Sequence, residues 1–178
     1  AGAGYAVLRI NFRGSGNYGR AFTQAGAREW GRAMQDDITD ATHWAIDQEI
    51  ADPARICLYG ASYGAYASLM GISREPDLYR CAAGYVGVYD LELLHKDGFG
   101  ASKSMRHWTA DWIGDRDDLA GVSPTHLAAR IKAPVFLAAG RAGYIAPIVH
   151  SRRMPRSLKA AGVPVENLYF DTDGHGFY

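Results

Sequence analysis

The segment Gly60–Gly64 reads G-A-S-Y-G, and its surroundings make it the most constraining feature of this chain. The apolar run 55–59 before it predicts a buried strand, and the small residues 65–70 after it predict a helix. A serine in a tight strand-to-helix turn has a strained backbone and an exposed hydroxyl, and flanking glycines remove side chains that would clash. The helix points its first amides at the serine, where they stabilise negative charge. The motif alone arises often by chance, but this context predicts nucleophilic attack by Ser62 on an acyl carbon.

A serine hydroxyl needs a base to take its proton, and His175 is the best candidate. It lies in the glycine-flanked segment 173–177, shortly after the strand-like run 167–170. The order of serine first and histidine later fits this class of hydrolase. Of the other five histidines, we interpret His43 and His126 as lying in or near helices, and His95, His107 and His150 as exposed residues of polar stretches.

Segments spread over nearly the whole chain extend the pattern beyond the serine motif. They are residues 4–8, 11–19, 34–37, 75–79, 123–124, 161–166 and 174–177. With these segments in this order, the chain resembles the catalytic domain of the prolyl oligopeptidase family of serine peptidases, in its dipeptidyl aminopeptidase and acylaminoacyl peptidase branch. The resemblance implies an alpha/beta-hydrolase fold, in which a mostly parallel sheet carries helices on both faces. It also implies that residues 1–178 form a single partial domain that lacks the first strands of the sheet.

The glycine-rich segment Gly14–Gly19 allows two interpretations. It is a literal G-x-G-x-x-G, the dinucleotide-binding fingerprint, which requires an acid at the end of a second strand about 20 residues on. Asp36 and Asp37 stand at that distance, but their context predicts the start of a helix, which disfavours the nucleotide interpretation. The family resemblance instead assigns the hydroxyl of Tyr18 to the oxyanion, with the backbone N–H of Tyr63 as the second donor. Such donors contribute several kcal/mol of transition-state stabilisation.

The third member of the triad is missing from its usual position. A catalytic histidine needs a carboxylate to fix its tautomer, and the resemblance places that aspartate at Gly143. Where related peptidases often carry a substrate-binding arginine, this chain has Ile145. Three explanations remain open: the enzyme is crippled, another carboxylate substitutes, or residues 141–145 are altered in an otherwise active enzyme. Asp90 is the best substitute, because it follows the strand-like run 85–89 and the end of that strand can face the histidine loop in the resembled fold. We interpret Asp171 and Asp173 as loop and turn residues.

Composition excludes some classes of function. Nineteen basic and nineteen acidic residues give a net charge of zero, which argues against an extended nucleic-acid surface. No apolar run is long enough to span a bilayer, no cofactor or metal site is predicted, and no compartment is assigned. The cluster Arg152, Arg153, Arg156 and Lys159 is interpreted as a solvated helix face. For Cys57 and Cys81 we favour two buried free thiols over one disulfide.

The alternation of strand and helix patterns predicts a mostly parallel sheet. Strands are expected at 5–11, 55–59, 81–89, 135–139 and 165–170, and helices at 31–48, 62–74, 151–161 and in pieces between 104 and 129. The resembled fold has three strands before the first of these, and one of them pairs with the strand that leads to Ser62. The sequence therefore predicts an open sheet edge, with low stability, self-association, or cover from an N-terminal segment or propeller domain.

The expected function is a serine hydrolase that cleaves aminoacyl or acylaminoacyl peptide bonds, or small acyl substrates, through an acyl-enzyme on Ser62. The alternatives are a catalytically inactive or truncated relative, an esterase of the same fold, and a dinucleotide-binding module.

Overall fold

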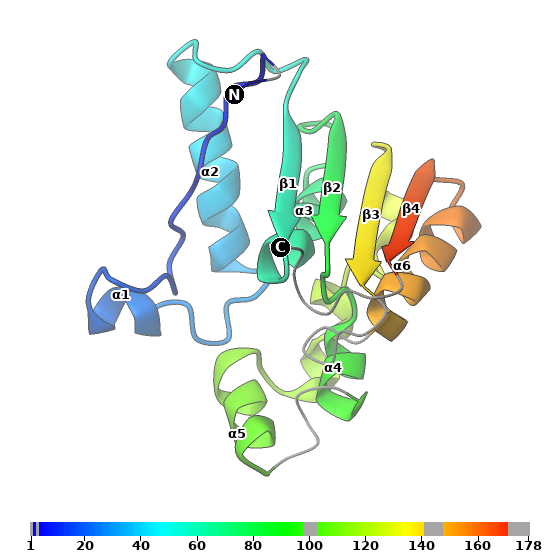
Figure 1. Cartoon of the computed structure of the whole chain (residues 1–178). Helices are drawn as coiled ribbons and strands as arrows, with labels where there is room; N and C mark the ends of the chain where they lie inside the picture. Colours follow the sequence, from blue (N-terminus) through cyan, green and yellow to red (C-terminus); the bar gives the residue numbers. More distant parts are fainter. Residues whose placement is uncertain (1, 3, 98–102, 141–147, 171–178) are drawn as a thin grey trace.

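A computed structural model describes residues 2, 4–97, 103–140 and 148–170 of the chain. Four strands form one sheet in the order β1-β2-β3-β4, and every neighbouring pair is parallel (Figure 1). Their bounds are β1 Cys57–Ala61, β2 Cys81–Tyr85, β3 Val135–Gly140 and β4 Val165–Phe170. The predicted parallel sheet is confirmed, although β2 ends four residues earlier than expected.

Helices connect the strands, as the alternating sequence pattern predicts. The helices are α1 Arg20–Gln24, α2 Ala33–Asp47, α3 Tyr63–Arg74, α4 Leu91–Asp97, α5 Lys103–Trp112 and α6 Ile148–Ala160, with short 3-10 turns at Arg116–Asp118, Ala120–Val122 and Ala128–Arg130. The sequence pattern located α2, α3, α5 and α6 and missed the short helices α1 and α4. None of the described helices is long and apolar enough to cross a membrane.

The strand expected at residues 5–11 is absent, because the segment pairs with no strand of the described chain. It runs as an extended segment beside α2, and the side chains of Tyr5 and Val7 are mostly exposed (Figure 1). An extended segment without hydrogen-bonded neighbours is not stabilised as a strand. Within the described residues β1 pairs only with β2, so the strand that leads to Ser62 forms a sheet edge, as expected.

One face of the sheet carries the main core. Helices α3 and α6 lie behind the sheet in Figure 1 and pack on that face. Leu58, Ala82 and Leu137 point from the strands into a core that includes Leu69 of α3 and Met154 of α6. Leu58 is partly buried, and the other four side chains are almost completely buried; such burial of apolar surface is the main source of stability for a layer of this kind.

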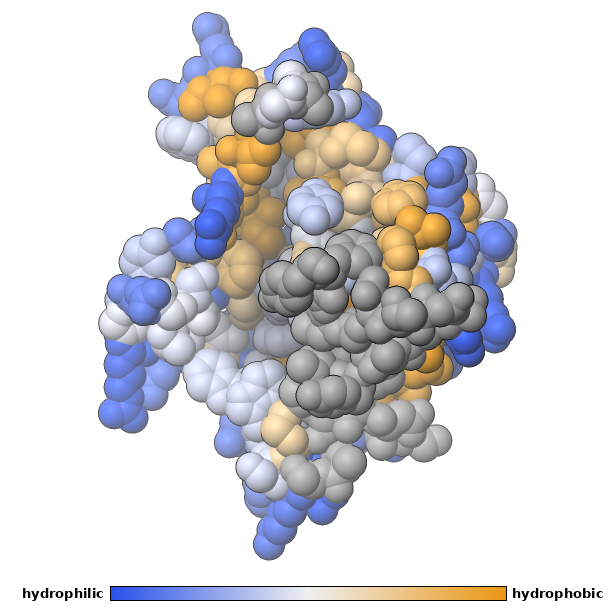
Figure 2. Space-filling model, in the orientation of Figure 1, coloured by the Kyte–Doolittle hydropathy of each residue, from blue (hydrophilic) through white to orange (hydrophobic). Residues whose placement is uncertain are grey.

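The opposite face of the sheet has no helix on it in the described part of the chain, so the expectation of helices on both faces is not met there. Tyr59, Phe136 and Leu168 on this face are 78%, 42% and 47% exposed. Orange apolar side chains are visible on the surface in Figure 2. Parallel sheets are normally covered on both faces, whereas within the described residues this sheet carries helices on one face.

A disulfide joins the first residues of β1 and β2, which corrects the preference for two free buried thiols. Cys57 and Cys81 are register partners in the sheet, and their Cα atoms are 4.7 Å apart. That separation lies within the range that a disulfide requires. Cys57 is exposed and Cys81 only partly buried, since both lie on the uncovered face. The sequence cannot show this pairing, because it depends on the register of two strands 24 residues apart.

Replacing both cysteines, Cys57→Ser with Cys81→Ser, is expected to lower the free energy of unfolding by about 3 kcal/mol, because the bond closes a 24-residue separation in the unfolded chain. Urea unfolding of the oxidised chain and the double variant measures the difference. The oxidised chain treated with a thiol reductant is the matched control and should unfold like the variant. Identical urea midpoints for all three proteins would show that the bond contributes nothing.

Candidate active site

Ser62 lies in the turn between β1 and α3 and has a strained backbone. Its φ is 54° and its ψ is −118°, a conformation that residues other than glycine rarely adopt. Its N–H donates to the carbonyl of Tyr85 on β2 at 2.8 Å, and its own carbonyl accepts from Ala65 and Tyr66 in the first turn of α3. Strain of this kind costs on the order of 1–3 kcal/mol and persists where the surroundings fix it. The sheet and the helix together hold Ser62 in the conformation expected of a nucleophile elbow.

Gly60 allows the chain to turn this tightly. A Cβ atom on Gly60 would overlap the backbone carbonyl carbon and oxygen of Gly64. A Cβ on Gly64 would meet no described atom within 4 Å. The expected steric reason for the two glycines therefore holds for Gly60 and is not found for Gly64.

The substitution Gly60→Ala is expected to destabilise the chain by about 3 kcal/mol or more, because the overlap involves backbone atoms that cannot move without distorting the elbow. Thermal unfolding measures this loss. The control is Gly64→Ala, which adds the same methyl group four residues away and should leave the unfolding temperature nearly unchanged. Equal effects of the two substitutions would contradict the close approach of the two glycines.

Tyr63 presents its backbone N–H at the start of α3, where the first amides have no partner within the helix. Its ring packs against Trp30 at 4.5 Å, Phe12 at 5.1 Å and Tyr66 at 5.6 Å between ring centroids. Burial, as the main cause, raises the pKa of the Tyr63 phenol well above its usual value, so this hydroxyl stays neutral. The aromatic contacts anchor the residue whose N–H is the expected oxyanion donor.

Tyr18 lies in the loop after the extended segment 5–11, and its side chain is 57% exposed. Its hydroxyl accepts a hydrogen bond from the Asn11 side-chain amide at 2.7 Å, which leaves the hydroxyl proton available to a ligand. The contact between Phe12 and Tyr63 connects this loop to the elbow. The structure therefore places the two predicted oxyanion donors on segments that touch.

An ion pair fixes the same loop to α2. Arg13 donates through its backbone N–H and its guanidinium to both carboxylate oxygens of Asp37, at 2.6–2.8 Å. The hydrogen bond from Arg13 is the main cause that lowers the pKa of Asp37 below its ordinary value. Asp36 pairs with Arg74 of α3 at 2.7 Å. Both acids lie in α2 and hold protein cations, which disfavours the ribose-binding role of the dinucleotide interpretation.

Asp90, the proposed substitute acid, is almost completely buried after the end of β2. One oxygen accepts from the N–H of Leu93, which caps α4, and the other lies 3.0 Å from the Arg153 guanidinium and 3.5 Å from His126 Nε2. Asp90 therefore has structural partners of its own. With Glu92 and His126 it forms a group whose ligand atoms lie within 4.8 Å of one another, but Arg153 already supplies a cation to it.

Several predicted site residues lie outside the described part of the chain: His175, Gly143, Ile145, Asp171 and Asp173. Among the other histidines, the expectation of exposure is wrong for His150. It is buried, and its Nδ1 accepts a hydrogen bond from the backbone N–H of Tyr89. The polar sequence around it lies on the outer side of α6, whereas His150 itself faces inward. A helical projection of residues 148–160 could have revealed this.

Comparison with known proteins identifies the family. A sequence profile of the prolyl oligopeptidase family matches residues 1–178. The chain belongs to the prolyl oligopeptidase family. It is 34% identical over 183 residues to dipeptidyl aminopeptidase BIII of Pseudoxanthomonas mexicana, covering 99% of this chain and 27% of that protein. It is 30% identical to the acylamino-acid-releasing enzyme of Arabidopsis thaliana, covering 97% of this chain and 24% of that enzyme.

Solved structures support the same family and fold. A puromycin-hydrolyzing peptidase of Mycobacterium tuberculosis matches with a TM-score of 0.86 at 29% identity, over 94% of this chain and 25% of that one. The resemblance to prolyl oligopeptidases inferred from the sequence is thereby confirmed, and with it the assignment to a family of serine peptidases that act on peptides. The chain spans about a quarter of the length of the relatives that it matches.

Proposed function

We propose that this chain carries the catalytic site of a serine peptidase that cleaves aminoacyl or acylaminoacyl peptide bonds. The observation that carries the proposal is the strained backbone of Ser62 at the junction of β1 and α3. A strained serine, a helix N-terminus and a second donor loop meet at this point, which is the arrangement that acyl transfer requires. Family membership supports the peptide as the substrate class.

In the proposed mechanism Ser62 Oγ attacks the carbonyl carbon of the substrate while His175 takes the hydroxyl proton. The carbonyl oxygen becomes an oxyanion that accepts from the Tyr63 N–H and the Tyr18 hydroxyl. His175 then gives its proton to the leaving amine, and an acyl-enzyme remains on Ser62. Water attacks the acyl carbon with His175 again acting as the base, which releases the acid product and restores the serine.

Glycine at position 143 predicts slow turnover. Without the triad acid the imidazole loses its fixed tautomer and the partner that stabilises its charged form, and in serine proteases this loss lowers turnover about ten-thousand-fold. A weakly active peptidase is therefore the form of the proposal that fits this sequence best. A catalytically inactive relative and an esterase of the same fold are the alternatives.

Comparing the hydrolysis of different substrates distinguishes these alternatives. We would measure hydrolysis of an aminoacyl p-nitroanilide, an acetyl-aminoacyl p-nitroanilide and the matching p-nitrophenyl ester by the 178-residue chain and its Ser62→Ala variant. The proposal predicts Ser62-dependent release of nitroaniline from at least one amide. Hydrolysis of the ester alone would favour an esterase, and hydrolysis that is as fast in Ser62→Ala as in its parent would reject Ser62 as the nucleophile.

We also propose that the open edge of β1 and the uncovered sheet face contact additional protein, either a further segment or propeller domain of a longer polypeptide or a second copy of this chain. The exposed strand edge and the exposed Tyr59, Phe136 and Leu168 support this. Sedimentation of the 178-residue chain should show self-association or poor solubility. A monomer that unfolds cooperatively would contradict the proposal.

A further inference from the structure

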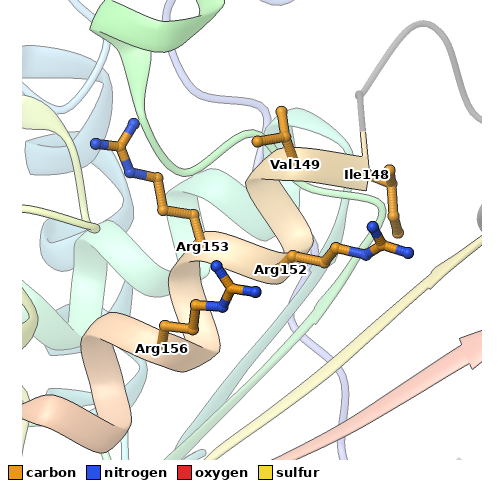
Figure 3. A pocket seen from close by; sticks show the side chains of 5 residues that line it. All are labelled: Ile148, Val149, Arg152, Arg153 and Arg156. Carbon is orange, nitrogen blue, oxygen red and sulfur yellow. The ribbon is translucent and has the colours of Figure 1, made fainter.

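The exposed side of α6 contains a cavity that has no part in the proposed chemistry at Ser62. We call it the α6 cavity (Figure 3). Its volume is about 430 Å³, and it is lined by Ile148, Val149, Arg152, Arg153 and Arg156. Sites for small organic ligands have volumes of roughly 300–1,000 Å³. The α6 cavity is thus large enough for a ligand with several functional groups rather than a single inorganic ion.

The three arginines do not have the same partners. The Arg153 guanidinium lies 3.0 Å from the buried Asp90 carboxylate. Arg152 and Arg156 are exposed, and neither has an acidic partner within ion-pair distance among the described residues. In Figure 3 the guanidinium of Arg153 extends to the opposite side from that of Arg152. Within the part of the chain that the structure describes, Arg152 and Arg156 are therefore the two cations of this lining without an acidic partner.

The position of these charges on α6 is electrostatically unfavourable without an anion. Arg152 and Arg156 stand four residues apart on one ridge of the helix, where like charges destabilise each other. The first turn of α6 also has no acidic residue that could offset this charge. An anion between the two guanidinium groups would offset the repulsion.

We propose that the α6 cavity binds a short acidic segment of a polypeptide. Carboxylates of the segment accept hydrogen bonds from Arg152 and Arg156, whose planar guanidinium groups match the two oxygens of a carboxylate. An apolar side chain of the same segment packs on Ile148 and Val149, the two apolar residues of the lining. The proposal changes the interpretation of the arginine cluster from a solvated face to a recognition surface. It does not depend on the chemistry at Ser62.

The test is fluorescence anisotropy with a Leu-Glu-Glu peptide that carries the fluorophore on its N-terminus and an amide at its C-terminus. The double variant Arg152→Gln with Arg156→Gln should bind the peptide more than about tenfold more weakly than the unmodified chain. Neither side chain has a described partner, so the fold is retained, and circular dichroism verifies this. The matched control is Lys159→Gln with Arg80→Gln, which removes the same charge from two exposed positions outside the cavity and should bind the peptide normally.

Two further measurements test whether the carboxylates of the peptide are required and whether a simple anion is sufficient. A Leu-Gln-Gln peptide should bind at least about tenfold more weakly, and inorganic phosphate should compete only at much higher concentration than the acidic peptide. Equal losses in the cavity and control variants would overturn the proposal, because attraction would then depend on net charge alone. Equal binding of Leu-Gln-Gln, or phosphate that binds as tightly as the acidic peptide, would overturn the assignment of an acidic peptide segment.

Discussion

Replacing Ser62 with Ala is expected to lower amide hydrolysis about a hundredfold in the present chain and about a million-fold in a chain that also carries Gly143→Asp. The difference follows from non-additivity within a triad. In subtilisin, loss of the serine alone lowers kcat about 2 × 10⁶-fold, whereas loss of the acid alone lowers it about 3 × 10⁴-fold. If Gly143 has already removed the acid, only the remaining factor of about a hundred can be lost with Ser62.

The measurement is kcat/KM for an aminoacyl p-nitroanilide in both backgrounds. Ser68→Ala is the matched control, because Ser68 lies on the same helix and donates to the carbonyl of Gly64 at 2.8 Å without belonging to the proposed site. It should retain most of the activity. A Ser62→Ala chain that hydrolyses the amide as fast as its parent would remove Ser62 from the mechanism.

Replacing Gly143 with Asp is expected to raise amide hydrolysis by up to about ten-thousand-fold. The added carboxylate would accept a hydrogen bond from the imidazole N–H of His175 and stabilise the charged form of the imidazole in the transition state. The gain should appear in kcat rather than in KM, because the acid acts when charge develops on the histidine and makes no direct contact with the bound peptide.

Two comparisons make the Gly143→Asp result specific. Gly143→Asn adds a side chain of nearly the same size without the charge and should not restore activity. Asp90→Asn retains an oxygen that can cap α4, so it tests whether Asp90 is the substitute acid. If Asp90→Asn abolishes the activity of the present chain and Gly143→Asp adds none, the substitute acid is Asp90 and the missing-acid account is wrong.

The sequence predicted the sheet well, because three of its strands are short apolar runs and helical segments separate successive strands. Strands that alternate with helices in this way pair in parallel. β3 and β4 match their predicted ranges almost residue for residue. The prediction of a strand at 5–11 is wrong, since a strand forms only when a neighbouring strand supplies hydrogen bonds. The sequence pattern does not reveal that this neighbour is absent among the described residues. The sequence disfavours a disulfide between Cys57 and Cys81 because the apolar runs around them indicate burial, whereas both residues lie on the uncovered face.

For the candidate site, the local part was the most predictable. The elbow is encoded within five residues, and its strained serine and the close approach at Gly60 follow from the strand before it and the helix after it. The contacts that support it come from distant positions, such as Phe12 packing on Tyr63 and Arg13 pairing with Asp37. The pairing of Asp90 with Arg153 joins residues 63 positions apart and could not be inferred from local sequence. The roles of His175 and Gly143 remain predictions from the family resemblance.

The most direct test of the central claim is to map the residue that a fluorophosphonate probe modifies. The 178-residue chain and its Gly143→Asp variant would be treated with the probe, digested, and sequenced by tandem mass spectrometry. The account predicts one phosphonyl adduct on Ser62, formed slowly in the present chain and rapidly in the variant. An adduct on a different residue, or none on Ser62 in either folded protein, would contradict the assignment of Ser62 as the nucleophile.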